Sequence, residues 1–396
     1  MMYRKLLYSA LGLFIMAAGL KAQSPMGLYY METIPQVSHL NPAMQPRANG
    51  FFALPNVNQL FQSDVAFSDV FQDVGGGEWV DPRSRRYDFA QLYKATGDAF
   101  NINEQVDVGL LGFGFRSGRD YFSFALSVKG AVNMGTPYDL LKIGENGFPA
   151  GSKFDFSTLR TKTITYKEIS LGYSREWNEY LTVGVNVKPL FGMVGMQSDI
   201  NRFELHTSRQ QYDLFVDGHI YSSAPLEVVE GAPGDFPESV EGKEMSDSDW
   251  SSYLSSFKNP GIALDMGAVY ALNDQWEFSA ALNNLGFIKW TEDLNSLSFD
   301  GTYSFKGLEV DGSNKDDLDA AVEAIGDSLK TVINYGVGQE SFSMGLIPAY
   351  TWAPVTTSTM PYPLAFCREV SSRRTTFGRI LTCPPTYNPT ALWPSM

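Results

Sequence analysis

The stretch from Asn259 to Trp290 constrains the fold more than any other part of the chain. Apolar residues alternate with small or polar ones through 264–270, and after a turn at Asn273-Asp274 the alternation resumes through 276–282. Period-two alternation on both sides of a turn predicts a β-hairpin. Each arm is about ten residues long, the length that a tilted strand needs to cross a bilayer. We therefore expect either a hairpin of a membrane β-barrel or one of a soluble β-sandwich.

Two further hairpins follow the same pattern and favour the barrel. One spans 111–128 with a turn at 117–120, and the other spans 169–187 with a turn at 177–179. A long connection at 56–103, with a helix expected at Tyr87–Ala95, precedes the first of these hairpins, and another at 133–163 separates the two. Tight turns on one rim and long loops on the other are typical of outer-membrane barrels. The chain is expected to be all-β, with an antiparallel barrel wall over 51–347.

The N-terminus carries the signals of an exported protein. Arg4 and Lys5 precede an apolar run from Leu6 to Leu20, and a small residue, Ala22, follows. This pattern predicts a secretory signal peptide over 1–22. Export together with the expected barrel predicts localisation in the outer membrane, with its lipid as a partner. The 396 residues have a net charge of −14, so no nucleic acid is expected to bind.

Residues 23–50 show no periodicity and are expected to form either a plug in the barrel lumen or a disordered leader. This segment contains Leu40, Asn41, Pro42 and Ala43. Because proline disfavours the helical region for the residue before it, Asn41 is expected to be extended, with its amide bonded to neighbouring backbone. The four residues form the predicted plug motif.

Two further segments are expected to lie outside the strands of the barrel wall. Residues 222–258 are dense in acidic side chains but lack EF-hand spacing, so a solvated loop is favoured over a calcium site. Apolar residues at helical spacing from Asp316 to Ile333 predict one amphipathic helix in a loop, and packing on a rim or in the lumen is favoured over binding to a partner.

No motif for catalysis or for a cofactor occurs. The three histidines, His39, His206 and His219, stand outside any metal or nucleophile pattern, and the chain has no G-x-S-x-G, Walker A or Rossmann sequence. We therefore expect no enzyme activity, no metal and no cofactor.

The segment 348–396 differs from everything before it, being rich in Pro, Thr and Arg and holding both cysteines. Because strands tolerate proline poorly, it is expected to be irregular and not to continue the wall. A disordered tail explains this, and so does a frameshift near Ile347, whether natural or a sequencing error. Under a frameshift the closing strands are missing, and the wall is expected to be an incomplete, curved sheet.

The order of the short motifs resembles that of a known family. LNPA at 40–43 is similar to the Asn-Pro-Ala element of FadL-type outer-membrane barrels. The run from NPG at 259–261 to LGFIKW at 285–290 resembles an FadL-like group related to PorV- and PorQ-type proteins. The resemblance implies about fourteen strands in a complete member, an N-terminal plug and passage of small hydrophobic compounds. The alternative is a non-transporting barrel that acts with a secretion component or binds at the cell surface.

Overall fold

The computed structural model describes residues 34–81, 84, 86–96, 99–229, 239–273, 275–305, 334–356 and 368–371. The predicted signal peptide, the first part of the predicted plug segment, the expected helix at Asp316–Ile333 and most of the tail lie outside these residues. Every strand pairing in the described sheets is antiparallel, so the all-β antiparallel class is confirmed.

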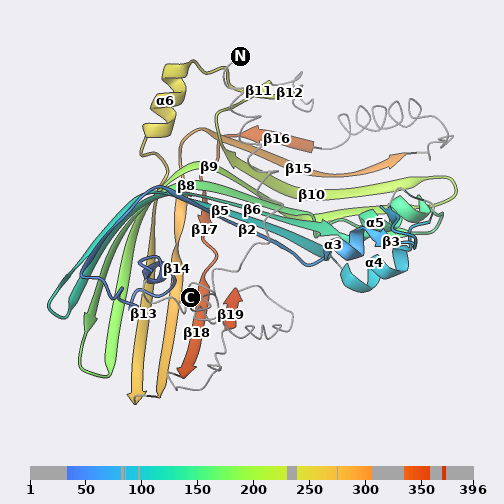
Figure 1. Cartoon of the computed structure of the whole chain (residues 1–396). Helices are drawn as coiled ribbons and strands as arrows, with labels where there is room; N and C mark the ends of the chain where they lie inside the picture. The colour runs from blue at the N-terminus through green and yellow to red at the C-terminus, as the bar shows by residue number, and fades with distance from the viewer. Residues whose placement is uncertain are drawn as a thin grey trace.

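One curved sheet of 15 strands forms most of the molecule (Figure 1). Its strands are β1 (Gly50–Ala53), β2 (Asn56–Ser63), β5 (Ala99–Ser117), β6 (Asp120–Pro137), β7 (Lys153–Asp155), β8 (Arg160–Glu176), β9 (Leu181–Thr207), β10 (Tyr212–Ser223), β13 (Pro260–Asn273), β14 (Trp276–Trp290), β15 (Leu294–Phe305), β16 (Asn334–Gly338), β17 (Phe342–Gly345), β18 (Ala349–Thr356) and β19 (Arg368–Ser371). The central order is β1-β5-β6-β8-β9-β13-β14-β18-β19. Among the described residues the two ends of this order are not paired, so the sheet is not seen to close.

Several short strands and helices lie outside the main sheet. Two separate two-stranded sheets are formed by β3 (Gln72–Asp73) with β4 (Trp79–Val80), and by β11 (Leu226–Val229) with β12 (Ser239–Gly242). The helices are α2 (Val37–Leu40), α3 (Phe67–Val70), α4 (Phe89–Thr96), α5 (Tyr138–Asn146) and α6 (Asp247–Ser255). In the described part of the chain, no helix has the length and apolar character needed to span a membrane.

The three predicted hairpins are all present, as β5–β6, β8–β9 and β13–β14. Their strands are longer than expected: β9 has 27 residues, which corresponds to about 90 Å at about 3.3 Å per residue. Its first half pairs with β13 and its second half with β10. The sheet therefore extends well beyond what a bilayer of about 30 Å requires.

The same lengthening corrects the predicted connections. The connection expected at 56–103 contains β2 at its start, and β5 begins at Ala99, while the expected helix is present as α4. The connection expected at 133–163 loses residues at both ends to β6 and β8. At the start of β5, Glu104 interrupts the apolar alternation between 100–102 and 106–108, so the strand could not be followed back to its beginning. The acidic loop expected at 222–258 likewise contains β11, β12 and α6.

The expectation that the chain is irregular from Pro348 onward is wrong for Ala349–Thr356. These residues form β18, which pairs with β14 from Asn283 to Trp276. Thr351 is buried while Tyr350 and Trp352 are exposed, so a short period-two alternation is present after all. Arg368–Ser371 also forms a strand, β19, beside β18.

Candidate functional site

The sheet is apolar on its exposed face and polar on its buried face over a band of strands. Ser170, Ser279 and Thr351 are buried, while their neighbours Leu171, Phe278 and Trp352 are exposed by 45% or more. The same arrangement, with apolar side chains on the exposed face, recurs along the sheet. The exposed residues are Phe113, Phe115, Phe122, Tyr173, Val187, Met266, Tyr270, Trp276, Leu285, Phe287 and Tyr350. A soluble sandwich would bury its apolar face, so this exposure pattern is opposite to that of a sandwich.

The exposed apolar side chains form a band across the strands, which we call the apolar band, and its height along each strand is defined. On β13 the exposed large apolar residues run from Ile262 to Leu272, and on β14 from Trp276 to Phe287. Each of these runs is about as long as a tilted strand that crosses a bilayer, which takes about 9–11 residues. Aromatic side chains lie at the tight-turn end of the band, where Trp177, Tyr180 and Trp276 are exposed.

The N-terminal segment 34–46 contacts the buried face. In Figure 1 the dark-blue start of the described chain lies on the concave side of the sheet. Asn41 ends α2 with φ −146° and ψ 111°, the extended conformation predicted for a residue before proline. Its Oδ1 accepts a hydrogen bond from the Ala43 backbone N–H at 2.9 Å, which fixes the bend.

Long-range contacts hold the predicted plug motif against β14. Asn283 Nδ2 donates to the Leu40 carbonyl at 2.7 Å, and Asn41 Nδ2 donates to the Ala280 carbonyl at 3.4 Å. Asn41 and Ala43 are buried. The structure thus brings Leu40, Asn41, Pro42 and Ala43 to the buried, concave face of the sheet, which we call the inner face.

Two glycines provide the space for this segment. A Cβ atom at Gly184 in β9 would overlap the Pro42 carbonyl, and one at Gly267 in β13 would overlap Asn41 Oδ1. Neither has a positive φ, so their small size is what the packing requires. At the other end of the segment, the Arg116 guanidinium donates to Gln45 Oε1 at 2.6 Å and to the Pro46 carbonyl at 3.0 Å.

A chain of alternating charges crosses the inner face beside this segment. Lys129 Nζ lies 3.6 Å from Asp107 Oδ2 and 2.8 Å from Glu168 Oε1. Lys188 Nζ lies 3.8 Å from Glu168 Oε1 and 2.5 Å from Asp265 Oδ2. The five residues belong to β5, β6, β8, β9 and β13, which are neighbours in the sheet. We call this set the charge chain.

The strand register explains how these side chains meet. Glu168 is paired with Leu190, two residues from Lys188, and Lys188 is paired with Ala263, two residues from Asp265. Diagonal neighbours of this kind are about 7–8 Å apart at Cα, within reach of long side chains. Asp107 lies directly opposite Lys129, and the other three contacts of the charge chain each join residues that are offset by two positions between neighbouring strands.

Asp265 is the best-satisfied member of the charge chain. It is fully buried and sits at an irregularity in the β13–β14 register. Its Oδ1 accepts from the Asn284 backbone N–H at 2.8 Å, and its Oδ2 accepts from Asn186 Nδ2 at 3.1 Å. By contrast, Glu168 Oε2 is buried and has no hydrogen-bond partner among the described residues.

His39 is the histidine nearest to the charge chain. Its side chain is exposed, yet desolvation by the surrounding protein lowers its pKa, and the positive charges of Lys129 and Lys188 lower it further. The other two histidines lie elsewhere, His206 beside Glu204 and His219 stacked on Tyr221.

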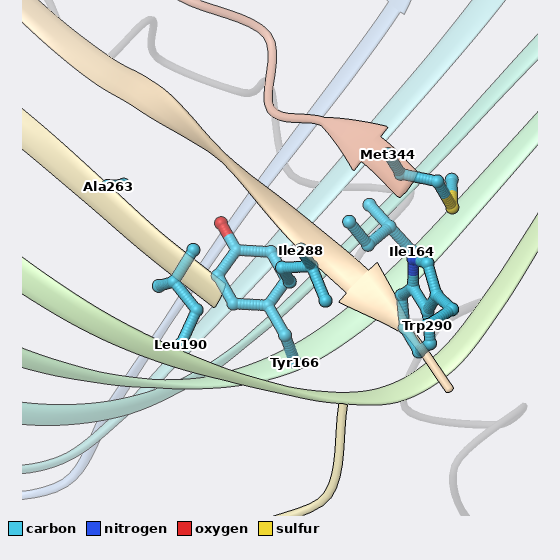
Figure 2. Close-up of a cluster of buried hydrophobic side chains, with 7 residues drawn as sticks. All are labelled: Ile164, Tyr166, Leu190, Ala263, Ile288, Trp290 and Met344. Carbon is cyan, nitrogen blue, oxygen red and sulfur yellow. The ribbon is translucent and has the colours of Figure 1, made fainter. Parts of the chain in front are cut away.

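An apolar layer follows the charge chain along the strands. Tyr166, Leu190 and Ala263 each lie two residues from a member of the charge chain and pack with Ile164, Ile288, Trp290 and Met344 (Figure 2). Trp290 is fully buried, and a Cβ at Gly192 or Gly195 would overlap its ring. Along the inner face the order is therefore N-terminal segment, charge chain, apolar layer.

Sequence reasoning identified part of this arrangement. Alternation placed Asp265, Gly184, Asn186 and Lys188 on the polar face, which is the buried face in the structure. Glu168 was missed, although a single acidic residue between Ile169 and Lys167 in a strand is the signal that could have indicated it. Among the described residues, no group of three His, Cys, Asp or Glu side chains is placed to hold a metal ion.

The fold and the inner face define a class: an antiparallel β protein built on one large curved sheet, with an N-terminal segment packed on its concave side. The chain belongs to a family described as "Family of unknown function (DUF5723)", whose model matches residues 42–352. The match extends past Ile347 to the middle of β18. Comparisons with curated proteins and with solved structures gave no match.

Proposed function

We propose that this protein is an outer-membrane β-barrel of the FadL-like kind, exported by its N-terminal signal and used for the passage of small hydrophobic compounds. The observation that carries the proposal is the reversed polarity of the sheet over a band of about ten residues per strand. Exposed apolar side chains on that band would be costly in water and are suited to lipid. Buried Ser, Asn, Lys, Glu and Asp side chains suit the wall of a lumen.

The N-terminal segment supports a gated rather than an open passage. Its backbone rests on Gly184 and Gly267, and its polar groups are paired with Asn283 and Arg116. Such a segment would act as the plug of the barrel, and cargo would pass when the plug moves. The inner face is polar at the level of the plug and does not by itself indicate an apolar cargo. The cargo class therefore rests on the FadL resemblance.

The test is a flux assay in liposomes with Asn41→Ala. The substitution removes the acceptor for the Ala43 N–H and the donor to Ala280, so the plug should loosen and leakage of small solutes should rise. Asn58→Ala is the control, because Asn58 is exposed and pairs only with Asn56 among the bonds seen for its side chain. Equal leakage and equal melting temperatures for the two variants would remove the gating role.

A second function, that of a non-transporting barrel which acts with a secretion component, is favoured by one specific observation. The charge chain and the apolar layer both extend across the inner face, so cargo would have to pass both. This function predicts no flux of any apolar solute together with co-purification of another protein. Flux of an apolar solute in purified liposomes would exclude it.

A further inference from the structure

Helix α6 lies on the outer, convex face of the sheet, immediately before β13 (Figure 1). The Lys167 ammonium donates to the Leu254 carbonyl at 3.0 Å and also to the Ser256 carbonyl. Lys167 has the same parity along β8 as Leu171 and Tyr173, which are exposed on the outer face. The helix is thus docked on the outer face and not on the concave one.

Both ends of α6 are fixed. At its start, Ser246 Oγ accepts from the Asp249 backbone N–H at 3.2 Å, and the Asp249 carboxylate accepts from the Ser246 backbone N–H at 3.0 Å. At its end, Lys167 satisfies the last carbonyls. Tyr253 Oη donates to the Met193 carbonyl of β9. These contacts orient the helix about its own axis.

With the helix held in this way, three large apolar side chains keep much of their surface exposed, although the Phe257 ring also contacts Phe191 of β9 and lies 5.0 Å from Lys167 Nζ. Trp250 and Leu254 are one helical turn apart and are exposed by 37% and 53%, and Phe257, just after the helix, is exposed by 64%. Asp247 and Asp249 lie at the other end of the segment, in its first turn. The docked helix therefore exposes apolar surface although it is short and otherwise rich in serine.

The position of α6 along the strands explains this exposure. The apolar band on β13 begins at Ile262, five residues after Phe257, and the band on β14 ends at Phe287. Since β13 and β14 are antiparallel, with Ile262 opposite Phe287, both mark the same border of the band. The helix thus lies at the level where lipid acyl chains would give way to headgroups, where Trp side chains are favoured.

We infer that α6 is an interfacial helix, which lies in the headgroup layer with Trp250, Leu254 and Phe257 dipping toward the acyl chains. Its partner is a lipid surface. The inference rests on the proposed membrane location of the sheet and adds to it a lipid-contacting element outside the barrel wall. Binding of this kind scales with the apolar area buried, so the three side chains carry it together.

The experiment uses fluorophore-labelled cysteines in the full chain carrying Cys367→Ser and Cys383→Ser, reconstituted in phosphatidylcholine vesicles. Trp250→Cys reports on α6, Leu171→Cys on the apolar band and Ser248→Cys on the serine side of the helix. Quenchers are placed in water, near the headgroups or deep in the acyl chains. We expect headgroup quenching at 250, deep quenching at 171 and aqueous quenching at 248.

The three sites separate failure of this inference from failure of the proposed function. Deep quenching at 171 with aqueous quenching at 250 would overturn the interfacial helix and leave the membrane location standing. Aqueous quenching at 171 would overturn the membrane location itself. Protection of 250 from all three quenchers would indicate a protein partner on α6 and would also overturn the lipid assignment.

Discussion

At the scale of single residues, the fit between the N-terminal segment and the sheet depends on the absence of two side chains. Gly267→Ala would place a methyl group against Asn41 Oδ1, in a segment already held by hydrogen bonds. Overpacking of this kind costs about 1–3 kcal/mol. We expect Gly267→Ala to lower the melting temperature and to expose residues 34–46 to protease.

Gly130→Ala provides the matched control in the same sheet. The nearest atom to a Cβ at Gly130 is Thr165 Oγ1 at 3.7 Å, an ordinary contact, so this variant should melt like the parent protein. Equal protease protection of residues 34–46 in both variants would show that the segment does not depend on the space at Gly267. A rise in protease cleavage confined to Gly267→Ala would show that the segment depends on this space.

The sequence predicted one half of this contact. The bend at Asn41 and Pro42 follows from local sterics, so it could be predicted without the fold. The partners Gly184, Gly267 and Asn283 are far away along the chain, and only the register of β9, β13 and β14 brings them together. No local pattern distinguishes these glycines from others on the polar face.

At the scale of elements, the hairpins were predictable because tight turns separate strands with clean alternation. Strand ends were not predictable where both faces are polar or where a strand changes its partner, as β9 does between β13 and β10. Period-two alternation fades at such places, although the backbone ladder continues. The short alternation at Tyr350, Thr351 and Trp352 was missed for a related reason, since Pro348 and Pro354 flank it.

The charge chain joins five neighbouring strands, so removing one of its charges should lower the stability of the sheet. Lys188→Met would leave Asp265 and Glu168 without their shared cation in a buried position. Loss of one partner from a buried ion pair costs about 3–5 kcal/mol. We expect the free energy of unfolding in detergent, measured with urea, to fall by about that amount.

Two further variants test the cause of this loss. Lys289→Met alters an exposed lysine of β14 and should change stability by about 0.5 kcal/mol or less. Adding Asp265→Asn to Lys188→Met removes the unpaired carboxylate and should recover part of the loss, because the two sites are in contact. Additive losses in the double variant would mean that the lysine acts through packing and not through charge.

At the scale of the whole molecule, the strands that follow β14 decide how far the wall of the proposed barrel extends. Irregular structure was expected from Pro348, yet β18 continues along β14 after β17, and the Leu346 N–H donates to the Gly286 carbonyl between these two strands. Together they cover β14 over most of its length. In lipid, an uncovered β14 would leave backbone donors and acceptors unpaired, each at a cost of several kcal/mol.

Truncation of the chain tests whether β18 belongs to the wall. A chain ending after Ile347 lacks β18 and should fail to insert, because the β14 edge from Trp276 to Asn283 loses its partner. A chain ending after Ser371 keeps β18 and β19 and should insert as the full chain does. Folding into vesicles, followed by protease protection of the wall, measures this difference. Equal protection of both truncated chains would show that β18 is not needed and that the wall ends at Ile347.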